Sequence, residues 1–197
     1  MTSKKEIWEV DDGAVDMECY SAQDIKILWI LRETNGSDFS FKEFLQNPKV
    51  YNKWKSTVGL VVKTSNSIIE GLDGVKGNKY PKDISMVMKK IAWINVKKTG
   101  GEARSNSNQL LHHAKENAEI IESQIRELSP DVVILAGTER LVSDRVKNEI
   151  NDLTKKQTVV VRAYHTNQRT ITHEKYIDHI LDKVNQFLHE RSQISRQ

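Results

Sequence analysis

Four short hydrophobic runs stand out along the chain, and each one stops at polar residues. The runs are Ile27–Leu31, Ile91–Ile94, Val132–Ala136 and Thr158–Ala163. Short apolar runs of this kind, bounded by polar residues, are typical of strands buried on both faces. The residues that follow them are Arg32-Glu33, Asn95, Gly137-Thr138 and Tyr164-His165. Because the carboxyl ends of parallel strands open onto one crevice, we expect a carboxylate, an amide and an imidazole to meet there.

The segments between these runs carry the three-to-four-residue spacing of amphipathic helices. The clearest helix is predicted between Ser107 and Leu128, and Ser129-Pro130 ends it because a residue before proline is pushed out of the α region. Further helices are predicted around residues 58–69, 141–150 and 177–188. Ser40 and Glu43 have capping-box spacing, which predicts a short helix after Ser40, and the turn-rich residues 71–78 predict a surface loop.

Strands that alternate with helices predict right-handed crossovers and an α/β fold, a three-layer α/β/α sandwich. We expect its central sheet to be four-stranded and mainly parallel. Residues 1–20 show no sustained period and are expected to form an acidic N-terminal leader. The remaining residues, 21–197, are expected to form a single domain, since a domain typically has about 100 to 200 residues.

Composition narrows the class of protein. No apolar run approaches the roughly 20 residues that span a bilayer, so we expect no membrane partner, a cytoplasmic location and a monomer. Cys19 is the single cysteine, which excludes an internal disulfide and a thiolate metal cluster.

Charge is distributed unevenly. The formal net charge is +3, and residues 1–20 hold two basic and six acidic side chains, a local sum of −4 that leaves +7 for the rest. A mildly basic body is compatible with binding phosphate backbones, although many soluble proteins carry such a surplus.

Two of the strand-end residues offer polar chemistry together with a plainer interpretation. Glu33 follows its strand closely enough to reach the crevice, or it is a helix-capping or surface carboxylate. The Asn95 amide can offer a donor and an acceptor to one planar partner, or it forms an Asx turn.

Basic residues and a histidine follow the second and fourth runs. The loop that contains Lys97, Lys98 and Arg104 can hold a phosphodiester, or it is a flexible solvated loop. His165, as a neutral imidazole, can donate a hydrogen bond to negative charge that builds on a leaving group, although a lone histidine is more often structural. In the same loop, Arg169 can meet a phosphate or the base stack, and Gln168 is a further DNA-binding candidate.

Taken together, these segments resemble the uracil-DNA glycosylase superfamily along most of the chain from Ile27 onward. In that family a residue after the first strand positions water, an asparagine at the end of a later strand reads the base, and a late loop supplies a histidine. The resemblance places Glu33, Asn95 and His165 in these roles, with Thr34 and Asn35 beside the base. The resemblance also implies a three-layer α/β/α sandwich, the fold that the alternation of strands and helices predicts.

The chain departs from the family pattern in two segments. The best-known branch has Asp-Pro-Tyr-His where this chain has Glu33-Thr34-Asn35-Gly36, so the tyrosine that crowds the C5 edge of uracil is missing. The late loop, Thr166-Asn167-Gln168-Arg169, lacks both the proline and the apolar wedge. These departures favour a bulky modified pyrimidine as the target, such as those in some phage DNA, and a role in defence rather than repair.

The resemblance implies hydrolysis of the N-glycosidic bond of a nucleotide flipped out of DNA, which leaves an abasic site. Glu33 would lie near the positive charge on the sugar and orient water, and His165 and Asn95 would face the negative charge on the base. This chemistry needs no metal or redox cofactor. Two rival classes stay open: a non-catalytic nucleic-acid-binding member of the same fold, and a hydrolase that acts on free nucleosides or nucleotides.

Overall fold

The computed structural model describes residues 12–33, 48–71, 81–99, 106–142, 144–155 and 157–194. One sheet runs through the described residues in the order β1-β3-β2-β4-β5. Its strands are β1 (Gly13–Ala14), β2 (Ile27–Leu31), β3 (Ile91–Asn95), β4 (Val132–Ala136) and β5 (Val159–Ala163). β2 is parallel to β3 and β4, and β4 is parallel to β5, so the four predicted strands and their direction are confirmed. The expected strand number is wrong, because β1 adds a fifth strand antiparallel to β3.

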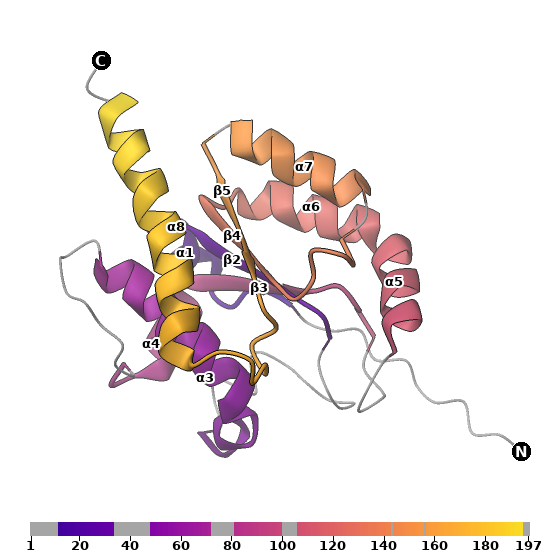
Figure 1. The fold of residues 1–197 in the computed structure, drawn as a ribbon, viewed down its shortest axis with the longest axis horizontal. Helices are drawn as coiled ribbons and strands as arrows, with labels where there is room; N and C mark the ends of the chain where they lie inside the picture. Colours follow the sequence, from indigo (N-terminus) through magenta and orange to yellow (C-terminus); the bar gives the residue numbers. More distant parts are fainter. Residues whose placement is uncertain are drawn as a thin grey trace, which may run out of the picture.

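Helices cover both faces of the sheet, which confirms the three-layer α/β/α arrangement (Figure 1). One face packs against α3 (Pro48–Gly71), α4 (Ile84–Lys89) and α8 (His173–Ile194). The other packs against α5 (Ser107–Glu116), α6 (Ala118–Leu128) and α7 (Asp144–Lys155), together with Tyr20 of α1 (Met17–Ser21). The described helices contain no stretch that is both long and apolar enough to span a bilayer.

The sequences of the central strands are continuous hydrophobic runs because both faces of these strands are buried. Trp29 and Leu31 of β2 face the α3 side, whereas Leu28 and Ile30 face the α6 side. The Trp29 indole Nε1 donates to the buried Ser65 Oγ at 2.9 Å, which gives the core its one polar contact with β2 side chains in the described residues. Packing on both faces therefore fixes β2 up to Leu31, the strand end from which Glu33 follows.

The N-terminal segment differs from the expected leader. Residues 12–20 belong to the folded domain: β1 extends the sheet, α1 begins at an Asp16 cap, and Tyr20 is 1% exposed. The reason is tertiary, because β1 is only two residues long and is held by pairing with β3 rather than by a pattern of its own.

Helix boundaries also differ from the predicted ones. The helix predicted over 107–128 is two helices, because Asn117 ends α5 and turns its side-chain Nδ2 to the Val96 carbonyl at 3.1 Å. α3 begins ten residues before the predicted start, at Pro48, where proline suits the first turn of a helix. α4 was not predicted, and the helix predicted after Ser40 lies outside the described residues.

Candidate functional site

The ends of four parallel strands supply the candidate site. Glu33 comes two residues after β2, Asn95 is the last residue of β3, Gly137 follows β4, and His165 comes two residues after β5. Neighbouring strands lie about 4.8 Å apart, so the backbones of β3 and β5 are about 14 Å apart across β2 and β4.

A backbone hydrogen bond orients the ring of His165, and its surroundings favour the neutral form. Burial lowers the pKa of His165, the positive charge of Arg32 lowers it further, and the Glu33 carboxylate opposes them. The ring Nδ1 accepts a hydrogen bond from the Asn167 backbone N–H at 3.1 Å, so the proton of the neutral ring lies on Nε2. A neutral imidazole with its proton on Nε2 can donate a hydrogen bond to an anion. Glu33 and His165 each come two residues after a strand of the parallel set, so both lie at the same end of the sheet.

Gly137 lets the loop after β4 approach His165 closely. Its φ of +70° favours glycine, and a Cβ added there would lie 2.9 Å from the His165 Cβ and 3.0 Å from the His165 backbone nitrogen. The Gly137 N–H donates to the Ala163 carbonyl at 2.8 Å, and its own carbonyl accepts from Arg32 Nε at 3.0 Å. Arg32 is thus fixed beside His165, a position that the sequence analysis did not assign.

A pocket of about 800 Å³ opens at this end of the sheet, next to His165. We call it the His165 pocket, and its lining comes from the strand ends and the start of α8: Arg32, Gly137, Glu139, Arg140, Arg162, Ala163, Tyr164, His165, Gln168, Ile171, Tyr176 and His179. Three arginines against one glutamate give it a basic lining, which suits an anionic ligand. Only one of those arginines is neutralised by the glutamate, through the Arg162–Glu139 contact of 3.1 Å.

Glu33 lies beside Lys97 rather than in open solvent. The Glu33 side chain is 12% exposed, and its Oε2 lies 3.8 Å from Lys97 Nζ. The backbone sets this contact, because the Lys97 N–H donates to the Arg32 carbonyl at 3.0 Å and so extends the β2–β3 ladder. An ammonium group at this distance interacts favourably with the carboxylate. Lys97 was predicted to bind DNA, but here it faces the carboxylate.

Asn95 is fully buried and keeps one donor without a partner. Its Oδ1 accepts from the Trp93 indole Nε1 at 3.2 Å, and its Nδ2 has no hydrogen-bond partner within the described structure. An unsatisfied buried donor costs about 1–3 kcal/mol, so such a group is worth a functional explanation. The remaining donor suits a carbonyl oxygen on a ligand. Because the side chain is 0% exposed, that ligand reaches it only when the covering residues move aside.

Lys98, which was predicted to bind DNA, lies in a buried network of polar side chains. Its Nζ lies 2.8 Å and 2.9 Å from the two carboxylate oxygens of Asp12 and 2.6 Å from Gln124 Oε1. The Asp12 carboxylate also accepts from the Asn95 backbone N–H at 2.6 Å. Burial lowers the pKa of Lys98, and the Asp12 charge opposes that shift. The network ties the N-terminal segment to the end of β3, and no pattern around Asp12 indicated it.

The late loop after β5 is ordered by its own side chains. Gln168 Oε1 accepts from the Ile171 N–H at 2.9 Å, and Gln168 Nε2 donates to the Ile171 carbonyl at 3.0 Å. Gln168, predicted to contact DNA, therefore shapes the loop. Arg169 is exposed and remains able to meet a phosphate. Tyr164, which the sequence analysis left unassigned, is 55% exposed beside His165.

Thr34, Asn35 and Arg104 lie outside the described residues, so their predicted roles stay predictions. In the described part of the chain, no group of three or more His, Cys, Asp and Glu side chains lies close enough to hold a metal ion.

A scan of the chain against known protein families found no match, and a search of curated proteins found no relative.

Proposed function

We propose that this protein is a DNA glycosylase that hydrolyses the N-glycosidic bond of a flipped uracil or modified pyrimidine and leaves an abasic site. The observation that carries the proposal is the placement of His165: its Nδ1 is occupied by the Asn167 N–H, which leaves Nε2 as the donor of the neutral ring, and it lies beside Arg32 at the end of the sheet that also carries Glu33. A hydrogen-bond donor and a carboxylate at the same end of the sheet suit a reaction that separates charge.

The reaction assigns a separate task to each group. As the C1′–N1 bond breaks, its electron pair leaves with the base and the sugar becomes cationic. Glu33 stabilises that cation and orients the water that adds to C1′, while His165 Nε2–H donates to the base oxygen on which negative charge collects. Water contributes hydroxyl to the sugar and a proton to the base, so the products are an abasic site and a free base. Asn95 Nδ2 would hold a base carbonyl once the nucleotide enters.

The basic lining of the His165 pocket supports DNA as the substrate class. The exposed Arg32 lines this pocket, and the exposed Arg169 belongs to the loop that follows His165; both suit phosphates on either side of a flipped nucleotide. Flipping costs a few kcal/mol, which such contacts repay. The proposal of a modified base rests on Asn35 in the sequence, where the family has a bulkier tyrosine.

The test is abasic-site formation on defined DNA. Duplexes that carry uracil, hydroxymethylcytosine or glucosylated hydroxymethylcytosine are incubated with the protein and then treated with alkali, which cleaves abasic sites. Strand breaks with a modified base support both parts of the proposal, and breaks with uracil alone refute the modified-base and defence part. Salt-sensitive DNA binding without abasic products would favour a non-catalytic binding protein, and release of bases from free nucleosides alone would favour a nucleoside hydrolase.

Glu33→Gln tests the assigned site. We expect a loss of about 100-fold or more in the single-turnover rate with folding intact, the effect of removing one preorganised charge. Glu116→Gln is the matched control, because Glu116 is an exposed residue of α5 and pairs only with neighbouring histidines among the described residues. Full activity of the Glu33 variant would remove Glu33 from the mechanism.

A further inference from the structure

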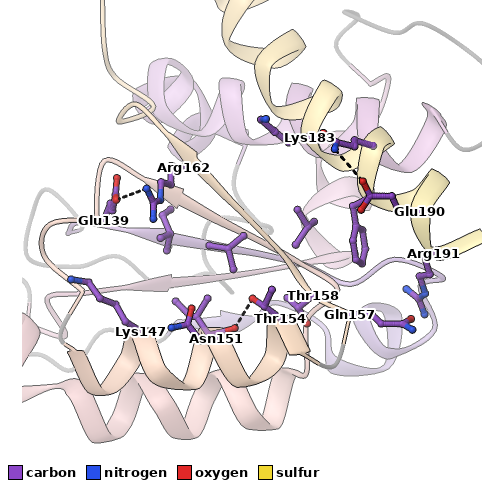
Figure 2. Close-up of a pocket in the computed structure, with 16 residues that line it drawn as sticks. Glu139, Lys147, Asn151, Thr154, Gln157, Thr158, Arg162, Lys183, Glu190 and Arg191 are labelled. Atoms are coloured by element: carbon purple, nitrogen blue, oxygen red, sulfur yellow. Dashed lines mark hydrogen bonds and ion pairs between the residues drawn. The ribbon is translucent and has the colours of Figure 1, made fainter. Parts of the chain in front are cut away.

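β5 is an edge strand with an open groove beside it. It pairs with β4 on one side only, and no other described strand lies on its second side. The groove beside it has a volume of about 740 Å³, and Figure 2 shows β5 crossing between α7 and α8, whose side chains point into it. We call it the edge groove. Its lining comes from β5, from the two helices and from the residues around them: Leu135, Glu139, Lys147, Ile150, Asn151, Thr154, Gln157, Thr158, Val159, Val160, Arg162, Lys183, Gln186, Phe187, Glu190 and Arg191.

The backbone of β5 presents hydrogen-bonding groups to this groove. The Val159 N–H donates to Asp131 and the Ala163 carbonyl accepts from Gly137, so the odd-numbered residues of β5 face β4. Because amide directions alternate along a parallel strand, the N–H groups of Val160 and Arg162 point to the open side. The Arg162 carbonyl is already used, since His179 Nε2 lies 3.0 Å from it, which leaves the Val160 N–H and C=O as the central pair. An edge of this kind is a template for another strand.

The α8 side of the groove carries one positive and one negative side chain, which are placed to pair with their counterparts on a second copy of the chain. Lys183 and Glu190 both line the groove, and seven residues of helix separate them by about 10 Å, too far to pair with each other. Within the described residues neither forms an ion pair; Glu190 accepts only from the Gln186 amide at 3.1 Å. A two-fold axis between Gln186 and Phe187 would place Lys183 of one copy opposite Glu190 of the other. The same axis would bring the two half-buried Phe187 rings together as an apolar centre.

Phosphate is a poor fit for the same groove. Two of its basic residues are already paired, Arg162 with Glu139 at 3.1 Å and Arg191 with Asp131 at 2.9 Å. Glu190 adds a negative charge beside them. The groove therefore combines positive and negative side chains with an open strand edge. This combination suits a second copy of the same surface better than it suits phosphate.

We propose that β5 pairs antiparallel with β5 of a second copy of this chain, in a two-fold dimer that joins the two sheets into one. With Val160 opposite Val160 of the second copy, these residues exchange N–H···O=C bonds, and each Arg162 N–H meets the Thr158 carbonyl of the other chain. The sequence analysis predicted a monomer. Under this proposal, the monomer is the form to which the dimer dissociates. The dimer does not depend on the proposed glycosylase function.

The test is the solution mass by sedimentation velocity or light scattering, between about 5 and 200 μM, where dimers of micromolar Kd dissociate. We expect a species of twice the chain mass of 22.7 kDa at the upper end. A mass of one chain throughout overturns the second copy as the occupant of the groove.

Charge reversal tests the geometry. Lys183→Glu and Glu190→Lys each put like charges opposite each other and are expected to raise the dimer Kd by at least about tenfold, whereas the double variant restores it. Both positions are exposed, so folding is preserved, and Lys175→Glu on the same helix outside the groove is the control. Val160→Pro removes the outward N–H that the second strand needs and is therefore expected to abolish the dimer. The monomer should still fold, because proline is tolerated on an edge strand where its nitrogen faces solvent. A dimer that none of these groove variants weakens uses another surface and refutes the proposal.

Discussion

Replacing Gly137 by alanine is expected to displace His165 and to destabilise the protein together. The positive φ of Gly137, +70°, and the 2.9 Å that would separate the new Cβ from the His165 Cβ are two separate penalties. The close approach involves the loop after β5. This loop is held by the hydrogen bond from the Asn167 N–H to the His165 ring and by the hydrogen bond from the Gly137 N–H to the Ala163 carbonyl. The loop therefore moves as a unit instead of turning one side chain away.

The magnitude follows from those two penalties. An L-residue in the left-handed region costs about 1–2 kcal/mol. Relief of an overpacked contact with backbone costs about 1–3 kcal/mol. The lower entropy of the unfolded chain with alanine returns about 0.4–1 kcal/mol. The net expectation is about 1–5 kcal/mol with a middle value of about 3 kcal/mol, which for a protein of this size lowers the Tm by about 6–12 °C.

Two other glycines separate strain from contact. Gly13 has a φ of +130° and nothing within 4 Å of its added Cβ, so Gly13→Ala tests strain alone and is expected to cost about 1–3 kcal/mol. Gly71 has neither a positive φ nor a close neighbour, and Gly71→Ala is expected to change stability by about 0.5 kcal/mol at most.

The decisive assay is NMR of the His165 ring beside thermal unfolding by circular dichroism. Only Gly137→Ala should shift the His165 signals and its pKa, and a displacement near 1 Å should lower any glycosylase rate by about 100-fold. If Gly137→Ala melts like the native protein, or if it leaves the His165 signals and pKa unchanged, the close approach described above is wrong.

Two further predictions concern protons and buried charge. Because the pKa of His165 is lowered by folding, the unfolded chain binds the proton more readily, so this group's contribution to stability is complete above about pH 6.5 and is lost as the pH falls below it. His165→Gln should flatten that part of the stability profile in urea unfolding, and a native ring that titrates at or above the usual value would contradict it. Lys98→Met leaves the Asp12 carboxylate, 2% exposed, without its ammonium group and is expected to cost about 3–5 kcal/mol in urea unfolding. The surface pair of Lys155 is the control, since Lys155→Met should cost less than about 1 kcal/mol, and equal losses would refute the buried role of Lys98.

The sheet was predictable because its strands are buried on both faces. Residues of β2, β3 and β4 form unbroken hydrophobic runs, and such runs bounded by polar residues have few other interpretations in an α/β chain. The same logic put Glu33, Asn95 and His165 at one end of the sheet, because parallel strands share a direction. A single sequence therefore predicts which residues lie at the same end of a parallel sheet.

Contacts between segments far apart in sequence were not predictable. Asp12 lies in an acidic stretch that looks like a solvated tail, yet its carboxylate bonds Lys98 and Gln124, more than 80 residues away. The two basic residues of the Lys97-Lys98 pair looked alike, but one faces Glu33 and the other Asp12. Only the fold decides which acid each lysine meets.

The site is held by bonds that pass from one strand end to the next rather than along any one segment. Thr138 Oγ1 donates to the Ile30 carbonyl at 3.0 Å, and Arg32 joins the same two strand ends through the Gly137 carbonyl. Lys97 extends the ladder to β3, and the Gly137 N–H extends it to β5. Because each strand end is fixed by its neighbour, a change at β4 reaches His165 on β5 without touching it. Preorganisation of this kind lets fixed groups stabilise charge without the cost of turning toward it, which is what the proposed cleavage of the glycosidic bond would require.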